Sequence, residues 1–149
     1  DKLSKLCSDD VEAIHVSVVQ MRKVQDQLNQ FVKRAEGIKP LDSLKAQANT
    51  ILKTIKTWEE ALIQSKSQSN DDVINFVNKL SANIIFLKGE VDGAGASPYV
   101  TKGQQIRYEE LHEEWKNYEQ QKNNLLEHEI KKFNEACRAA NWNFVGFEN

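Results

Sequence analysis

The chain has 149 residues, of which 40% are apolar and 28% are charged, with six glycines and two prolines. This length fits one domain that can bury a core without metals, and few glycines and prolines favour long helices. The 20 basic residues are scattered and the net charge is −2, which excludes an electrostatic footprint for nucleic acid. No apolar run approaches the roughly 18 residues of a membrane span. We therefore expect one soluble helical domain over residues 1–149, with no nucleic-acid partner and no membrane insertion.

The first predicted helix covers residues 8–35, and a further turn can precede it. Its apolar residues follow a 4-3-4-3 spacing, broken at Gln25, that places them on one stripe. Asp9 and Asp10 suit the positive end of the helix dipole in the first turn, and Gly37 follows the last turn as a stop signal. The stripe consists of Cys7, Val11, Ile14, Val18, Met21, Leu28 and Val32.

The second predicted helix begins at Pro40, because proline is tolerated at the first helical position. Its apolar residues are spaced 3-4-3-4-3-4 without a break. The connector of four residues before it implies that the first two helices are antiparallel neighbours. The stripe consists of Leu41, Leu44, Ala48, Ile51, Ile55, Trp58 and Leu62.

A polar segment, residues 64–70, precedes a third and shorter helix that Asp71 or Asp72 can cap and that runs to about Val91. Its stripe consists of Val73, Val77, Leu80, Ile84, Leu87 and Val91. A second apolar face is added by Ile74, Phe76, Ile85 and Phe86. This helix is therefore either the most buried one or the one that meets another molecule.

The last predicted helix covers residues 101–140, after a turn at residues 93–98, and would be about 60 Å long. Thr101 and Gln104 form a capping-box pattern at its start. Lys122 interrupts the apolar stripe and marks a drift in register, which arises when a straight helix outruns a strict heptad. The stripe consists of Tyr108, Leu111, Trp115 and Tyr118 before this point and of Leu126, Ile130, Phe133 and Cys137 after it.

These elements predict an all-α fold, an antiparallel up-down bundle of four helices in which the third is short. The alternative is a three-helix bundle whose second and third helices form one kinked arm. The up-down path brings the start of the first helix beside the end of the last, which would place Cys7 near Cys137. A disulfide between them requires Cα atoms within about 4.4–6.8 Å and would add up to about 4–5 kcal/mol in the chain-entropy model. The alternative is two small buried thiols.

Glu-x-x-His occurs twice, as Glu12/His15 and Glu109/His112. Two such motifs supply ligands in di-iron helical bundles, but the neighbouring stripe residues place Glu12 and Glu109 on the solvent side and His15 and His112 at the flank of the stripe, so we expect both motifs on solvated helix faces. His128 lies on the outer face of the last helix without a third ligand for zinc. Because the sequence also lacks a nucleophile elbow and a phosphate-binding loop, we predict no catalytic residue, no metal and no cofactor. A metal-binding bundle is a remote alternative.

Two other segments are candidates for contact with another domain. The polar connector stands out between regular helices, although a solvated loop is the alternative. The tail, residues 142–147, carries four large apolar residues in six, so we expect it to fold back on the bundle or to dock on another domain. The candidate contact residues are Gln64, Lys66, Gln68, Asn75, Phe76, Trp142, Phe144 and Phe147.

Five segments carry a family resemblance: MRKVQDQL (21–28), WEEALIQSK (58–66), DVINFVNKL (72–80), YEEL (108–111) and FNEA (133–136). In this order they resemble the helical C-terminal region of bacterial sortilin-like Asp-box (BNR-repeat) β-propeller proteins, which are often labelled glycosyl hydrolases. The chain departs from that pattern at Val73 and Val77, where similar chains carry proline. The two cysteines are also not part of the pattern.

The resemblance implies an exported parent protein, periplasmic or secreted, in which a propeller precedes this chain. The start at Asp1, without an initiator methionine or signal segment, agrees with the expectation that the chain is a processed piece of such a protein. The expected function is that of a non-catalytic structural or interaction domain appended to the propeller. The alternative is a protein- or glycan-binding module that acts through the third helix and the aromatic tail. A homodimer is expected if an apolar patch makes a two-fold contact with itself.

Overall fold

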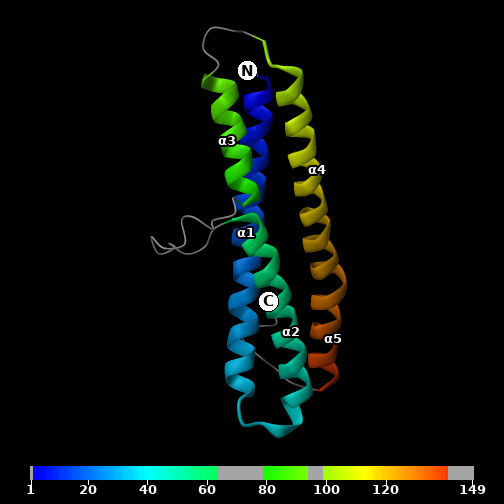
Figure 1. Ribbon diagram of the computed structural model, residues 1–149. Coiled ribbons are helices and arrows are strands. Elements are labelled where there is room, and N and C mark those ends of the chain that lie inside the picture. Colours follow the sequence, from blue (N-terminus) through cyan, green and yellow to red (C-terminus); the bar gives the residue numbers. More distant parts are fainter. Residues whose placement is uncertain (1, 64–78, 94–98, 141–149) are drawn as a thin grey trace, which may run out of the picture. The chain divides into compact units, whose positions relative to one another are not determined.

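The computed structural model describes residues 2–63, 79–93 and 99–140 (Figure 1). Helix α1 covers Lys2–Ala35, the 3-10 turn η1 covers Lys39–Leu41, α2 covers Asp42–Leu62 and α3 covers Leu80–Gly93. The last helix is continuous through α4 (Lys102–Asn124), the π-helical segment η3 (Leu125–Ile130) and α5 (Lys131–Ala139). No strand occurs in these three ranges. The all-α bundle with a short third helix is confirmed.

Local signals account for several of the helix ends. Gly37 adopts a φ of +77°, a conformation that L side chains rarely adopt, and α1 ends two residues before it, as predicted. Gln104 N–H donates to Thr101 Oγ1 over 3.0 Å, and Thr101 N–H donates to Gln104 Oε1 over 3.1 Å. These two bonds confirm the capping box at the start of α4. The start of α1 differs from the prediction: the helix begins at Lys2, so Asp9 and Asp10 lie beyond its first turn.

The heptad of α2 is confirmed in full, because all seven predicted stripe residues are buried. In α1 the predicted stripe residues are buried except for Val11 and Val32, which are only half-buried. Phe31, next to Val32, is fully buried. In α3 the four stripe residues that the structure describes are buried, namely Leu80, Ile84, Leu87 and Val91.

None of the helices in the described ranges has the length and apolar character of a membrane-spanning segment.

The chain divides into two compact units. Unit 1 comprises residues 1–17 and 59–119, and unit 2 comprises residues 18–58 and 120–149. This division does not test the expectation of a single domain over residues 1–149, which stays a prediction. Among the residues that the structure describes, each unit contains three long helical stretches, two of which belong to α1 and to the last helix.

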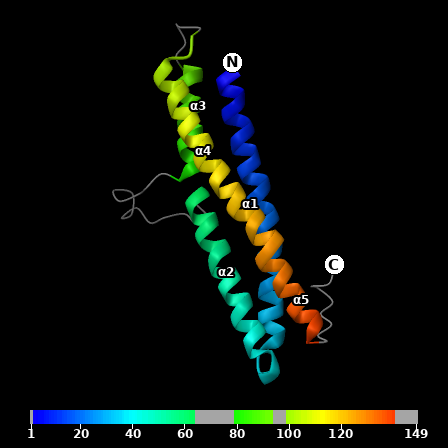
Figure 2. The ribbon, with the colours of Figure 1, turned by 90° about the vertical axis from the view of Figure 1, so that its right-hand side faces the viewer.

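In unit 1, the first half of α1 packs with α3 and α4 (Figure 2). Asp10 on α1 contacts His112 on α4, and Ser4 on α1 bonds to Asp92 near the end of α3. The ribbon shows that α3 runs opposite to α1, whereas α4 runs parallel to it (Figures 1 and 2). The buried apolar side chains of the unit are Leu3, Cys7, Ile14, Leu62, Leu80, Ile84, Leu87, Val91, Tyr108, Leu111 and Trp115.

In unit 2, the second half of α1 packs with α2 and with the end of the last helix. Lys122 Nζ donates to Gln20 Oε1 over 3.3 Å, and the rings of Phe31 and Phe133 meet edge to face with centroids 5.1 Å apart. Both pairs are separated by 102 residues, so the two helices run parallel in this unit. α2 runs antiparallel to α1 after the short connector, as predicted.

These directions correct the expectation that the start of the first helix lies beside the end of the last helix. In unit 1, the first turns of α1 lie beside the first half of α4, as the Asp10 to His112 contact shows. The up-down reasoning failed here because it assigned the direction of the last helix from the helix count alone. Within each unit, the three-stretch arrangement agrees with the three-helix alternative.

The segment η3 explains the register drift predicted at Lys122. Upstream of it, Tyr108, Leu111 and Trp115 are buried at spacings of three and four residues, and downstream Phe133 and Cys137 continue four residues apart. The two series differ by one residue, and a π-turn accommodates one extra residue in a helix. Leu125 is buried at this junction, whereas the predicted Leu126 is only half-buried.

Candidate functional site

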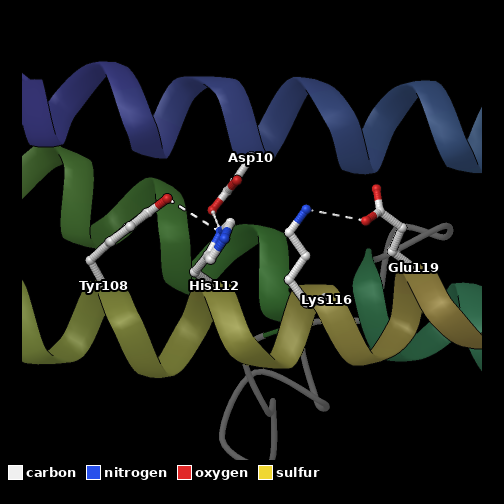
Figure 3. A network of polar contacts seen from close by, with 5 residues as sticks. All are labelled: Asp10, Tyr108, His112, Lys116 and Glu119. Atoms are coloured by element: carbon white, nitrogen blue, oxygen red, sulfur yellow. Dashed lines mark hydrogen bonds and ion pairs between the residues drawn. The ribbon is translucent and has the colours of Figure 1, made fainter.

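A polar cluster in unit 1 consists of Asp10, Tyr108 and His112 (Figure 3). Asp10 projects from α1, and its Oδ2 lies 2.8 Å from His112 Nδ1 on α4. The Tyr108 hydroxyl lies 3.3 Å from the same nitrogen, one helical turn earlier. Asp10 is 7% exposed, which is rare for a carboxylate unless it has a partner. Burial and the short contact make this pair the main polar link between α1 and α4.

Electrostatics decides where the protons of this cluster lie. A carboxylate only accepts hydrogen bonds, so the short contact places a proton on His112 Nδ1 that is donated to Asp10. Since Nδ1 is then a donor, the Tyr108 hydroxyl donates to Asp10. Burial raises the pKa of Tyr108 far above its usual value, and the charge and hydrogen bond of Asp10 raise it further. The phenol therefore stays protonated, and its ring stacks on His112 with centroids 5.4 Å apart.

The contacts of the cluster join α1 to α4. An aspartate that orients a histidine needs a nucleophile or a substrate proton within reach of the imidazole. The one thiol in unit 1 is Cys7, and burial, followed by the charge of Asp10, raises its pKa. A raised pKa keeps this thiol protonated and makes it a poor nucleophile. The cluster thus aligns α1 with α4, and Lys116 and Glu119 form a separate ion pair of 3.2 Å further along α4.

The two Glu-x-x-His motifs take different positions. Glu12, His15 and Glu109 are exposed, as predicted, but His112 is half-buried and bonded to Asp10. The half-buried position of His112 agrees with its predicted place at the flank of the stripe, whereas its bond to Asp10 was not predicted. His128 is exposed on the outer face of the last helix, as predicted. Within the described ranges, no group of three or more His, Cys, Asp or Glu residues could bind a metal ion.

The two cysteines are free and buried. Cys7 lies in unit 1, beside Lys88 and Asp92 of α3, and Cys137 lies in unit 2. Both thiols are free in the structure, and the bridge between them stays a prediction from the sequence. The alternative of two small buried thiols describes the structure. Burial raises the pKa of Cys137 to about 11.

The eight residues proposed for inter-domain contact lie outside the described residues. They are Gln64, Lys66, Gln68, Asn75, Phe76, Trp142, Phe144 and Phe147.

The second apolar face predicted for the third helix is present in its described part. Opposite its buried stripe, α3 presents a side that we call the α3 outer face, which consists of Ala82, Ile85, Phe86, Gly89 and Gly93. Phe86 is 67% exposed and Ile85 is 51% exposed. A shallow groove of about 480 Å³ runs beside Phe86, Gly89 and Gly93 and is bordered by Glu90 and by Gln104 of α4. The sequence predicts the apolar residues Ile85 and Phe86 of this face, but it does not predict the groove beside Gly89 and Gly93.

No family model, no curated protein and no solved structure matches the chain.

Replacement of Asp10 tests the polar cluster. Asp10→Ala leaves the Nδ1 proton of His112 and the Tyr108 hydroxyl without their common acceptor, so we expect the free energy of unfolding to fall by about 1–3 kcal/mol. Asp9→Ala is the matched control, because Asp9 is exposed and pairs only with the exposed Lys5. Its loss should cost at most about 0.5 kcal/mol. Urea unfolding measures both values, and equal losses would contradict the assignment.

Thiol titration tests the state of the cysteines. Cys7 is 0% exposed and Cys137 is 5% exposed, so a thiol reagent at pH 8 should react at least about tenfold more slowly with the folded chain than with the unfolded chain. After unfolding without a reductant, two thiols per chain should react. A chain that yields no reactive thiol under these conditions would contain the bridge and would contradict the structure.

Proposed function

We propose that this chain is a non-catalytic structural and interaction domain that meets a protein partner through the α3 outer face. The observation that carries the proposal is the exposure of Phe86 and Ile85 on a helix whose opposite side is already buried. Burial of a Phe side chain contributes roughly 1.5–3 kcal/mol relative to full exposure. The isolated domain does not gain this free energy from Phe86, but a complex in which a partner covers the side chain does.

The chemistry of the polar groups supports a role without catalysis. The buried carboxylate of Asp10 is committed to His112 and Tyr108, and both thiols have raised pKa values. These groups align helices or fill the core. The described polar residues thus contribute to the stability of a scaffold, and the exposed apolar residues of α3 provide its contact surface.

The context of the domain is a finer part of the proposal and rests on the resemblance of the five quoted segments. In this proposal, the chain extends from the Asp-box β-propeller that precedes it in an exported, periplasmic or secreted protein. This context allows two positions for the α3 outer face, one turned toward the propeller and one turned away from it.

A second candidate function is a binding module for a separate protein or glycan. The groove beside Phe86 favours it, because an exposed aromatic ring next to a hollow can take an apolar side chain or the face of a sugar ring. The two candidates share the α3 outer face and differ in what covers it.

Covering of the α3 outer face can be measured in the intact gene product. Hydroxyl-radical footprinting should modify Phe86 at least about threefold more slowly in the intact protein than in the isolated chain at low micromolar concentration, because a partner excludes solvent from the ring. Val16 is the matched control, since it is 62% exposed on α1 of the same unit, and its rate should not change. Equal rates for Phe86 in the two samples would count against the proposed function.

A further inference from the structure

A buried polar atom without a partner lies on the last helix, in unit 2. The side-chain oxygen Oδ1 of Asn134 is buried and has no hydrogen-bond partner among the described residues. A buried amide oxygen without a donor is costly, because it has lost its bond to water and gained none from the protein. Native structures therefore rarely leave such an atom unpaired. Asn134 thus marks a place where a donor is missing.

The surroundings of Asn134 define what kind of group fits there. Phe133, the preceding residue, is fully buried, and Ile130 is half-buried. Residues four apart are neighbours on a helix surface, so Ile130 and Asn134 form one edge of the buried stripe. A group that covers this edge has to combine an apolar body with a hydrogen-bond donor. An indole ring has both, whereas water supplies only the donor.

The backbone turns where the last helix ends. Helix α5 ends at Ala139, and Ala140 follows with φ −81° and ψ 0°. These are the angles of the second central residue of a type I turn, so the chain leaves the helix axis at Ala140. The Ala140 N–H donates to Ala136 O over 3.1 Å, which holds this turn against α5. A turn at this point is what a segment that packs back on α5 requires.

We propose that the segment after Ala140 packs back along α5 and that the indole N–H of Trp142 donates a hydrogen bond to Asn134 Oδ1. This segment belongs to unit 2, as α5 does, and lies outside the described ranges. Asn134 is six residues, or about 9 Å along the axis, from Ala140. Two extended residues cover up to about 7 Å, and the Trp142 side chain spans the remaining distance. An indole N–H only donates, which matches an acceptor that lacks a donor.

The spacing of the aromatic residues in the tail matches that of the helix edge. In an extended chain, alternate residues point to the same side and lie about 6.6 Å apart. Residues four apart on a helix lie about 6 Å apart along the axis. With Trp142 over Asn134, Phe144 therefore lies over Ile130. Of the two positions that the sequence predicts for the tail, this is the one folded back on the bundle.

The inference is independent of the proposed function, because it concerns unit 2, whereas the α3 outer face belongs to unit 1.

Hydrogen exchange of the three indole N–H groups in the full chain, followed by NMR, tests the inference. The Trp142 signal is identified by its loss in Trp142→Phe. We expect this N–H to exchange at least about tenfold more slowly in the folded chain than in the chain unfolded in urea, because a bonded proton exchanges only on opening. Asn134→Leu removes the acceptor and should raise the Trp142 exchange rate at least about fivefold. Asn124→Leu is the matched control, since Asn124 is exposed on the same continuous helix, and should leave the rate unchanged.

Folding of the variants is followed by circular dichroism. Leucine is a better helix former than asparagine, so Asn134→Leu should keep its helix content, and a faster exchange would then not result from unfolding. Exchange of the Trp142 N–H as fast in the folded chain as in urea overturns the inference, and so does protection that Asn134→Leu leaves unchanged. Protection that falls on dilution would place the tail on another copy of the chain and would also overturn it.

Discussion

The contact between the Asp10 carboxylate and the His112 imidazole is the constraint on which unit 1 depends. A carboxylate that is 7% exposed loses its hydration and needs partners from the protein. His112 and Tyr108 of α4 supply them, across a sequence separation of 102 residues between Asp10 and His112. A slip of α4 by one residue would turn both partners away from Asp10 and leave a buried charge. The polar pair therefore fixes the same register that the buried apolar side chains Leu111 and Trp115 require.

The last helix keeps its buried side facing its unit by changing its winding. A straight α-helix turns its apolar stripe away from a partner over several heptads. The π-turn of η3 absorbs one residue between Leu125 and Ile130, and Phe133 then returns to the core against Phe31. The interruption of the apolar stripe at Lys122 and the π-turn of η3 have the same cause, which is one extra residue in the last helix.

Sequence reasoning succeeded where the determinants are local. The α2 heptad, the Thr101 and Gln104 capping box and the stop at Gly37 depend on residues within a few turns, and all three are confirmed. It failed where a distant partner decides the outcome. Asp10 reads as a dipole-stabilising residue until His112, 102 residues away, is placed beside it. The direction of the last helix was also unpredictable from periodicity, because an amphipathic stripe is equally apolar in either direction. Of the contact surface, Ile85 and Phe86 were predicted, but the space at Gly89 appears only in three dimensions.

The parallel register of α1 and α4 in unit 1 can be measured directly by a distance between two spin labels. Asp9 and Glu113 are exposed neighbours of the contacting pair, and labelled cysteines can replace them in a chain with Cys7→Ala and Cys137→Ala. The parallel register predicts a distance of about 10–25 Å between the labels. In the antiparallel arrangement that brings Cys7 beside Cys137, the two positions would be some 22 residues, or about 33 Å, apart along the axis. A distribution centred beyond about 30 Å would contradict the account.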